Sequence, residues 1–65
     1  MLKVPLEIVV PIYNEGRKVL DLLDQFQAFI KTEFRVLLCY DSDDDDIFEY
    51  KNDLQKLTCE VYLVK

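Results

Sequence analysis

Two short stretches of the sequence contain the residue types that could recognise a small molecule. In VVPIYNEG, residues 9–16, an apolar run ends at Tyr13 and Glu15. In CYDSDDDD, residues 39–46, a second apolar run ends at Asp41. An ionised carboxylate only accepts hydrogen bonds, so it suits the ring N–H of a base and the hydroxyls of ribose. Because a tyrosine ring can also offer its face to a base, the two stretches indicate a site for the nucleoside half of a nucleotide.

Other kinds of site fit these stretches less well. Neither contains the GxGxxG or GxxxxGK[ST] loop of dinucleotide and P-loop sites. The alternate aspartates of residues 41–46 match the opening of an EF-hand, but Asp46 replaces the required glycine and Asn52 the bidentate glutamate. A receiver-like phosphoacceptor pocket would need acids after the first strand, which the Tyr-Asn-Glu turn fits poorly. We therefore interpret residues 44–46 as a solvated helix start, where the helix dipole favours acids.

Length and composition restrict the class of protein. At 65 residues the chain is at most one small domain, and such a domain buries only roughly 60% of its unfolded surface. A net charge of −5 argues against nucleic acid or an anionic membrane as a partner. No apolar stretch approaches the roughly 20 residues of a membrane span. With no histidine, no CxxC motif and two cysteines, we expect reduced thiols in a soluble, cytoplasmic protein.

Five segments must position these residues. Residues 6–13, 34–40 and 60–64 are short and rich in apolar, β-branched and aromatic residues, which is typical of buried parallel strands. Two helices are expected between them, because apolar residues recur there at helical spacing. The first stripe contains Val19, Leu22, Leu23, Phe26, Phe29 and Ile30, and the second contains Ile47, Tyr50, Leu54 and Leu57. We expect Asn14 to cap the first helix and Ser42 or Asp43 to cap the second.

The predicted fold is α/β, a β-α-β-α-β half of a Rossmann-like parallel sheet. Right-handed crossovers that continue in one direction place both helices on one face of the sheet. The opposite face would then be bare. The first two strands, however, are apolar at almost every position, which is typical of strands that are buried on both faces. We interpret residues 1–65 as the first part of a larger doubly wound domain. In such sheets ligands bind beyond the carboxyl ends of the strands, where both candidate stretches lie.

The two stretches resemble a known family. VVPIYNEG, an amphipathic helix and then FRVLLCYDSDDDD are similar to the start of family-two nucleotide-sugar glycosyltransferases of the GT-A type, which include dolichol-phosphate mannose synthase. The match covers roughly residues 6–64. The chain departs from the family at Tyr40, where relatives often have an Asp, and at residues 43–46, where a Gly-Ser-Thr-Asp type of turn is usual. These departures leave the identity of the nucleotide open.

The resemblance implies roles for five residues. Pro11, Tyr13 and Glu15 would line the nucleotide pocket, Cys39 would contribute through its backbone beside the base, and Asp41 would hydrogen-bond the base. The family's metal-binding Asp-x-Asp and catalytic base lie after later strands, so we expect no catalytic residue and no metal ligand in this chain. The Mg²⁺ or Mn²⁺ of the full enzyme would be held elsewhere.

The expected function is therefore the donor-nucleotide-binding part of a glycosyltransferase, with residues 1–65 as a single N-terminal segment that is inactive in isolation. Its partners would be a nucleoside-diphosphate-sugar and whatever covers the bare sheet face, either the rest of the transferase domain or a second copy. Two alternatives stay open. The chain could be a non-enzymatic α/β module that binds a nucleotide or a metal, or an interaction domain that docks through its bare face. On the simplest interpretation, Tyr13 is a core ring and Asn14 with Glu15 only begins a helix.

Overall fold

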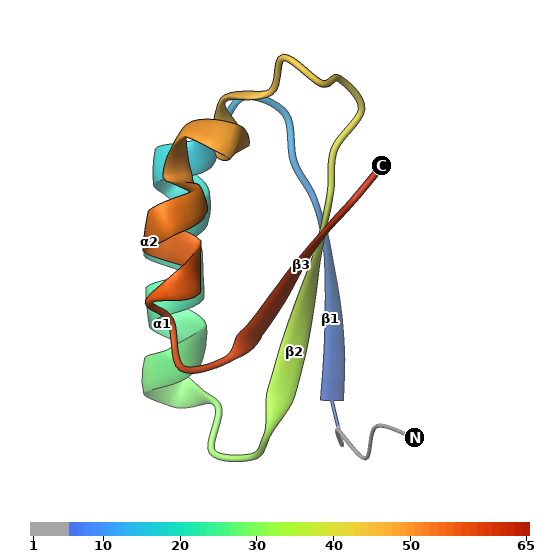
Figure 1. Cartoon of the computed structure of the whole chain (residues 1–65). Helices are drawn as coiled ribbons and strands as arrows, with labels where there is room; N and C mark the ends of the chain where they lie inside the picture. Colours follow the sequence, from blue (N-terminus) through green and yellow to red (C-terminus); the bar gives the residue numbers. More distant parts are fainter. Residues whose placement is uncertain (1–5) are drawn as a thin grey trace.

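The computed structural model describes residues 6–65, which form a parallel sheet of three strands in the order β1-β2-β3 (Figure 1). The strands are β1 (Leu6–Pro11), β2 (Phe34–Cys39) and β3 (Glu60–Val64). In the register, Ile8 lies opposite Val36 and Val36 opposite Val61. The predicted parallel sheet is confirmed, and its third strand has the predicted bounds.

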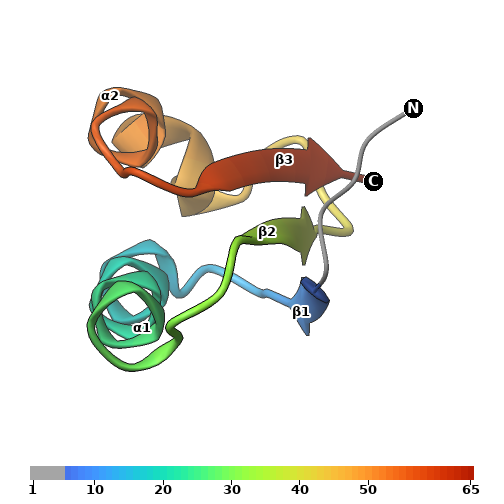
Figure 2. The ribbon, with the colours of Figure 1, turned by 90° about the horizontal axis from the view of Figure 1, so that it is seen from below.

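Helices connect each strand to the next. Helix α1 (Gly16–Phe29) links β1 to β2, and the 3₁₀ helix η1 (Asp46–Tyr50), followed by α2 (Lys51–Gln55), links β2 to β3. Seen along the strands, both helical connections lie on one side of the sheet and form a single layer (Figure 2). The predicted β-α-β-α-β order and the single helical face are therefore confirmed. No helix within residues 6–65 is long and apolar enough to cross a membrane.

The core lies between the sheet and this helical layer. Its buried residues come from the turn after β1 and from α1, β2, η1 and α2: Ile12, Val19, Leu23, Val36, Leu38, Ile47 and Leu54. The half-buried side chains of Val61 and Leu63 pack against it from β3. Burying one such aliphatic side chain contributes about 1.5–3 kcal/mol, so this small set supplies much of the hydrophobic stabilisation.

The predicted stripe of α1 is wrong at its last turn. Phe29 is 77% exposed, whereas Leu20 packs against the core. At 3.6 residues per turn, Leu20 lies about 60° around the helix from the fully buried Leu23, while Phe29 lies about 120° away. The spacing of apolar residues alone did not show on which side of Leu23 the helix faces the core.

Both predicted helix caps are also wrong. Asn14 lies outside α1; the N-cap residue is Glu15, and its side chain makes no capping hydrogen bond. The second connection begins with a 3₁₀ turn rather than an α-helix, and Asp45 caps it by accepting a hydrogen bond from the Ile47 N–H at 2.9 Å. Leu57 lies beyond the end of α2. At the start of α1, the N–H groups of Asn14 and Gly16 donate instead to the side chains of Asp45 and Asp46 in the second connection.

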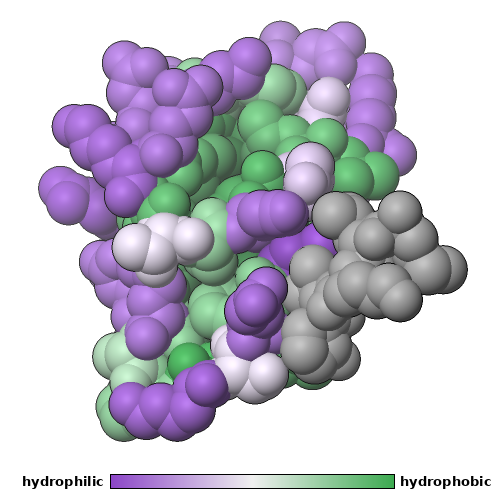
Figure 3. Space-filling view, turned by 60° about the horizontal axis from the view of Figure 1, so that its bottom comes forward, coloured by the Kyte–Doolittle hydropathy of each residue, from purple (hydrophilic) through white to green (hydrophobic). Residues whose placement is uncertain are grey.

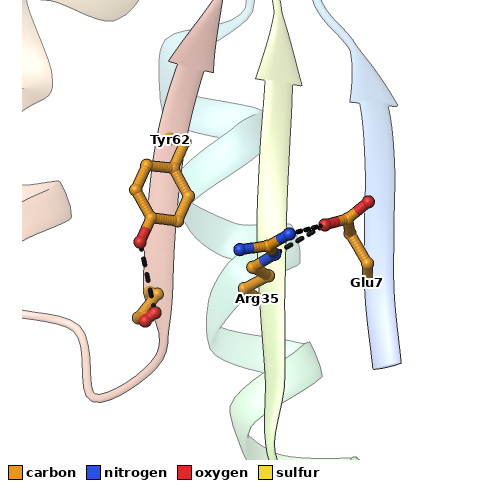
Figure 4. Close-up of polar contacts among 4 residues, drawn as sticks. Glu7, Arg35 and Tyr62 are labelled. Atoms are coloured by element: carbon orange, nitrogen blue, oxygen red, sulfur yellow. Dashed lines mark hydrogen bonds and ion pairs between the residues drawn. The ribbon is translucent and has the colours of Figure 1, made fainter. Parts of the chain in front are cut away.

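The face of the sheet opposite the helices is open, as predicted, and no element within residues 6–65 covers it. It carries a polar group at its amino end, where Arg35 forms an ion pair with Glu7 and lies 5.9 Å from the centroid of the Tyr62 ring (Figure 4). Beside this group, Val9 is 59% exposed. Hydrophobic residues also remain visible between hydrophilic ones at the lower side of the molecule (Figure 3). Apolar side chains such as Val9 are therefore exposed to water on this face of the sheet.

Candidate functional site

The two connections that follow β1 and β2 lie at the same edge of the sheet (Figure 1). Beyond the last paired residues, the Ile12 N–H donates to the Cys39 carbonyl at 2.9 Å, and the Tyr40 N–H donates to the Val64 carbonyl at 2.8 Å. These bonds continue the sheet by one residue on each strand. The two candidate stretches of the sequence therefore meet at the carboxyl edge.

The five predicted site residues occupy this edge with different degrees of exposure. Pro11 ends β1 and is the register partner of Cys39, which ends β2 and is half-buried. Tyr13 follows β1 and is 69% exposed. Glu15 is exposed just before α1, and Asp41 is exposed two residues after the end of β2. Tyr13 is therefore not a core ring, and three side chains of the predicted types are accessible at one edge.

A hollow of about 180 Å³ lies at the β1 side of this edge. Pro11 and Glu15 line it together with Val10, Ile12, Lys18, Val19 and Leu22. Tyr13, Cys39 and Asp41 do not line it. The structure thus brings two of the five residues to one hollow, and the other three lie outside it on the same edge.

A set of hydrogen bonds that the sequence did not indicate locks the two connections together. Asp45 is only 4% exposed, and its Oδ2 accepts the Asn14 N–H at 2.9 Å. In return, Asn14 Oδ1 accepts the Asp46 N–H at 3.0 Å, and Asp46 Oδ1 accepts the Gly16 N–H at 3.0 Å. We call the side chains of Asn14, Asp45 and Asp46 the turn clamp. The interpretation of residues 44–46 as solvated is wrong for Asp45, and Asp46 is only half-exposed.

Asn14, at the centre of the first turn, has an unusual backbone conformation. Its φ is 47°, in the left-handed region that residues other than glycine seldom adopt. Asparagine is one of the few residues that tolerate this conformation. The Asn-Glu pair would have indicated a tight turn as well as a helix start, but no local signal identifies Asp45, 31 positions away, as the acceptor.

The remaining acids of the run do not converge on a common point. Asp43 pairs with Lys65 at 3.0 Å in an exposed ion pair, and this hydrogen bond raises the pKa of the Lys65 ammonium. Asp45 instead accepts a hydrogen bond from the Asn14 N–H. Within residues 6–65 no three Cys, Asp or Glu side chains are grouped so that they could hold a metal ion.

Both cysteines are free thiols, as the sequence predicted. Cys59 lies at the other end of the sheet, next to a hollow of about 390 Å³ that Gln27 and Thr58 also line. Gln27 Oε1 accepts from both the Thr58 N–H at 2.7 Å and its hydroxyl at 2.8 Å. Burial raises the pKa of the Cys59 thiol, so it stays protonated at neutral pH. These contacts join α1 to the start of β3 and give no indication of a second site.

Comparisons with protein-family models, with curated proteins and with solved structures give no match to this chain. The chain is a small α/β domain with three parallel strands in β-α-β-α-β order, which is half of a Rossmann-like sheet.

Proposed function

We propose that this chain is the donor-nucleotide-binding part of a nucleotide-sugar glycosyltransferase. The observation that carries the proposal is the juxtaposition of the two turns at the carboxyl edge, with Tyr13, Glu15 and Asp41 exposed there. Ligands of open α/β sheets bind at this edge. The resemblance of the same residues to the family's nucleotide pocket supports the same assignment.

Each of the three side chains has a chemical role in the proposal. The Tyr13 ring offers its face to the base. The Asp41 carboxylate accepts a ring N–H of the base, and Glu15 accepts from a ribose hydroxyl, because an ionised carboxylate has no proton to donate. The Cys39 carbonyl already accepts the Ile12 N–H, so only its second lone pair is open to a base. Pro11 fixes the direction of the backbone before Tyr13 through its restricted φ.

The transfer step would need residues that this chain does not supply. An acceptor hydroxyl would form a bond to the anomeric carbon of the sugar while the bond from that carbon to the nucleoside diphosphate breaks. A base would take the hydroxyl proton, and Mg²⁺ or Mn²⁺ would neutralise the leaving diphosphate. We assign the base and the metal ligands to the rest of the transferase domain, which would also cover the open face of the sheet.

Nucleotide binding by the chain tests this proposal. Isothermal titration with UDP, GDP, CDP and ADP in the presence of Mg²⁺ is expected to show selective binding of one of them. Asp41→Ala should raise the Kd for that nucleotide at least tenfold, because a lost charge-assisted hydrogen bond costs about 1.5–3 kcal/mol.

The matched control is Asp44→Ala, which removes the same charge from an exposed position in the same run and should leave the Kd within about twofold of the wild-type value. Absence of binding by the folded wild-type chain would contradict the proposal. Binding of Mg²⁺ or Mn²⁺ that is indifferent to nucleotide would instead favour a metal-binding module.

A further inference from the structure

We propose that Asp45 is a positioning residue for the nucleoside, which it never touches: through the turn clamp it fixes the two turns that carry Tyr13, Glu15 and Asp41 relative to each other. This inference rests on the proposed function, since it explains how that site is held in shape.

The contacts of the Asp45 carboxylate identify it as the link. Its Oδ2 accepts from the Asn14 N–H in the first turn, and its Oδ1 accepts from the Ile47 N–H in its own connection, both at 2.9 Å. Both oxygens therefore face backbone donors. With 4% of the residue exposed, water is a poor replacement for either partner. A buried hydrogen bond of this kind is stronger than an exposed one and costly to leave unmade.

The first turn is held at the residue that controls its direction. Asn14 lies between Tyr13 and Glu15 in the chain, and it has the left-handed φ of 47° that turns the backbone from β1 into α1. Fixing the N–H of Asn14 therefore fixes the directions in which its two neighbours leave the backbone. The return bond from the Asp46 N–H to Asn14 Oδ1 holds the same residue from its side chain.

The second turn is held through the backbone of Asp45. Its N–H donates to the Ser42 carbonyl at 3.1 Å, which closes the turn directly after Asp41. Asp45 thus connects the turn that carries Tyr13 and Glu15 to the turn that carries Asp41. If the two turns were flexible, ordering them on binding would cost conformational entropy and weaken the affinity. Because Asp45 holds the two turns together in the free protein, part of this cost is removed before the ligand binds.

The decisive substitution is Asp45→Asn, which keeps the size of the side chain. An amide has one oxygen, so its NH₂ group must face one of the two backbone donors, and one bond becomes a repulsion. At a temperature where circular dichroism shows the variant folded, we expect the Kd for the nucleotide selected in the titration to rise at least tenfold. Exchange of the Asn14 amide proton, followed by NMR, should be at least tenfold faster. The matched control Asp44→Asn should change neither quantity by more than twofold.

A double-mutant cycle separates positioning from a general loss of stability. If Asp45 acts by placing Tyr13, then Asp45→Asn should raise the Kd much less in a Tyr13→Ala background than in the wild type. An equal rise in the wild type and in the Tyr13→Ala, Glu15→Ala and Asp41→Ala backgrounds alike would overturn the inference.

A second variant keeps the test decisive if Asp45→Asn does not fold. Asp45→Ser keeps one oxygen that can cap the Ile47 N–H, and it removes the oxygen that accepts the Asn14 N–H without placing an NH₂ group against a backbone donor. We expect its Kd to rise at least threefold. If the wild type binds and the folded variants bind equally well, this inference alone is overturned. If the folded wild type binds none of the four nucleotides, the proposed function and this inference are overturned together.

Discussion

At the scale of single residues, aspartates that are neighbours in the sequence have different environments and contacts. Asp43 pairs with the exposed Lys65, Asp44 is exposed, and Asp45 is buried against Asn14. The difference lies in what each side chain meets across the fold. A run of aspartates that looks uniform in the sequence therefore contains one residue whose removal should affect the site and others whose removal should not.

Gly16 is a second residue defined by what it meets. A Cβ built on it would lie 2.5 Å from two ring carbons of Tyr50 and 3.2 Å from Asp46 Oδ1. Real Cβ atoms essentially never approach another atom to 2.5 Å, and a contact of 3.2 Å is tight. The first residue of α1 therefore has no side chain because the ring of Tyr50, at the end of η1, packs directly over it.

We predict that Gly16→Ala destabilises the protein by about 1–3 kcal/mol, the usual cost of overpacking. The sign is informative, because the same change inside a free helix would stabilise it by about 1 kcal/mol. Urea unfolding followed by circular dichroism measures the effect. In a Tyr50→Ala background the clash is absent, and Gly16→Ala should cost much less. An unchanged cost in that background would show that Tyr50 is not the cause.

At the scale of elements, the helices depend on packing for their existence. Helix α1 has 14 residues and α2 only five, and isolated helices shorter than about 12–15 residues are marginal in water. Leu23 is fully buried at the centre of α1 and belongs to the cluster that includes Val36 and Leu38 of β2. The stability of α1 and that of the sheet are therefore coupled through this cluster.

We predict that Leu23→Ala costs about 2–5 kcal/mol of unfolding free energy. A domain of this size has only about 3–10 kcal/mol in total, so the variant should be largely unfolded at 37 °C. Leu22→Ala, one position along the same helix and only half-buried, is the control and should cost clearly less. Thermal unfolding by circular dichroism compares the two, and equal midpoints would contradict the packing of α1 described here.

At the scale of the whole molecule, the open face of the sheet is the dominant feature. A patch of three strands, about 4.8 Å apart and roughly 20 Å long, covers only about 300 Å², whereas a stable interface buries about 800 Å² on each partner. The net charge of −5 adds repulsion between copies. A second copy could therefore cover this face only weakly.

We predict that the chain is monomeric at micromolar concentration and associates weakly at higher concentration, more strongly when salt screens the repulsion. Val9→Asp should abolish this association, because Val9 lies exposed on the open face. The control is Phe29→Ser, which removes a still more exposed apolar side chain from α1. Sedimentation velocity at several concentrations measures the effect, and a loss of association in the Phe29 variant instead would place the contact on the helical side.

By itself, the sequence determined the class of fold and the edge of the sheet at which the candidate residues lie. Strand and helix periods are local properties, and the right-handed crossover places both helices on one face once the order of elements is known. The placement of Tyr13, Glu15 and Asp41 at this edge follows from the same reasoning, since the carboxyl ends of parallel strands lie at one edge of the sheet.

Only the tertiary structure decided which acid is buried, where the helices begin and which side of α1 meets the core. Asp45 caps η1 and also accepts the N–H of Asn14, 31 residues away, just before α1, and no local pattern predicts a contact between residues so far apart in the sequence. Phe29 and Leu20 both lie at helical spacing from other apolar residues of α1. Only the position of the sheet decides that Leu20 packs against the core and that Phe29 is exposed. The close approach of Tyr50 to Gly16 likewise depends on how two connections pack, because contacts across the fold are properties of its geometry and not of any one segment.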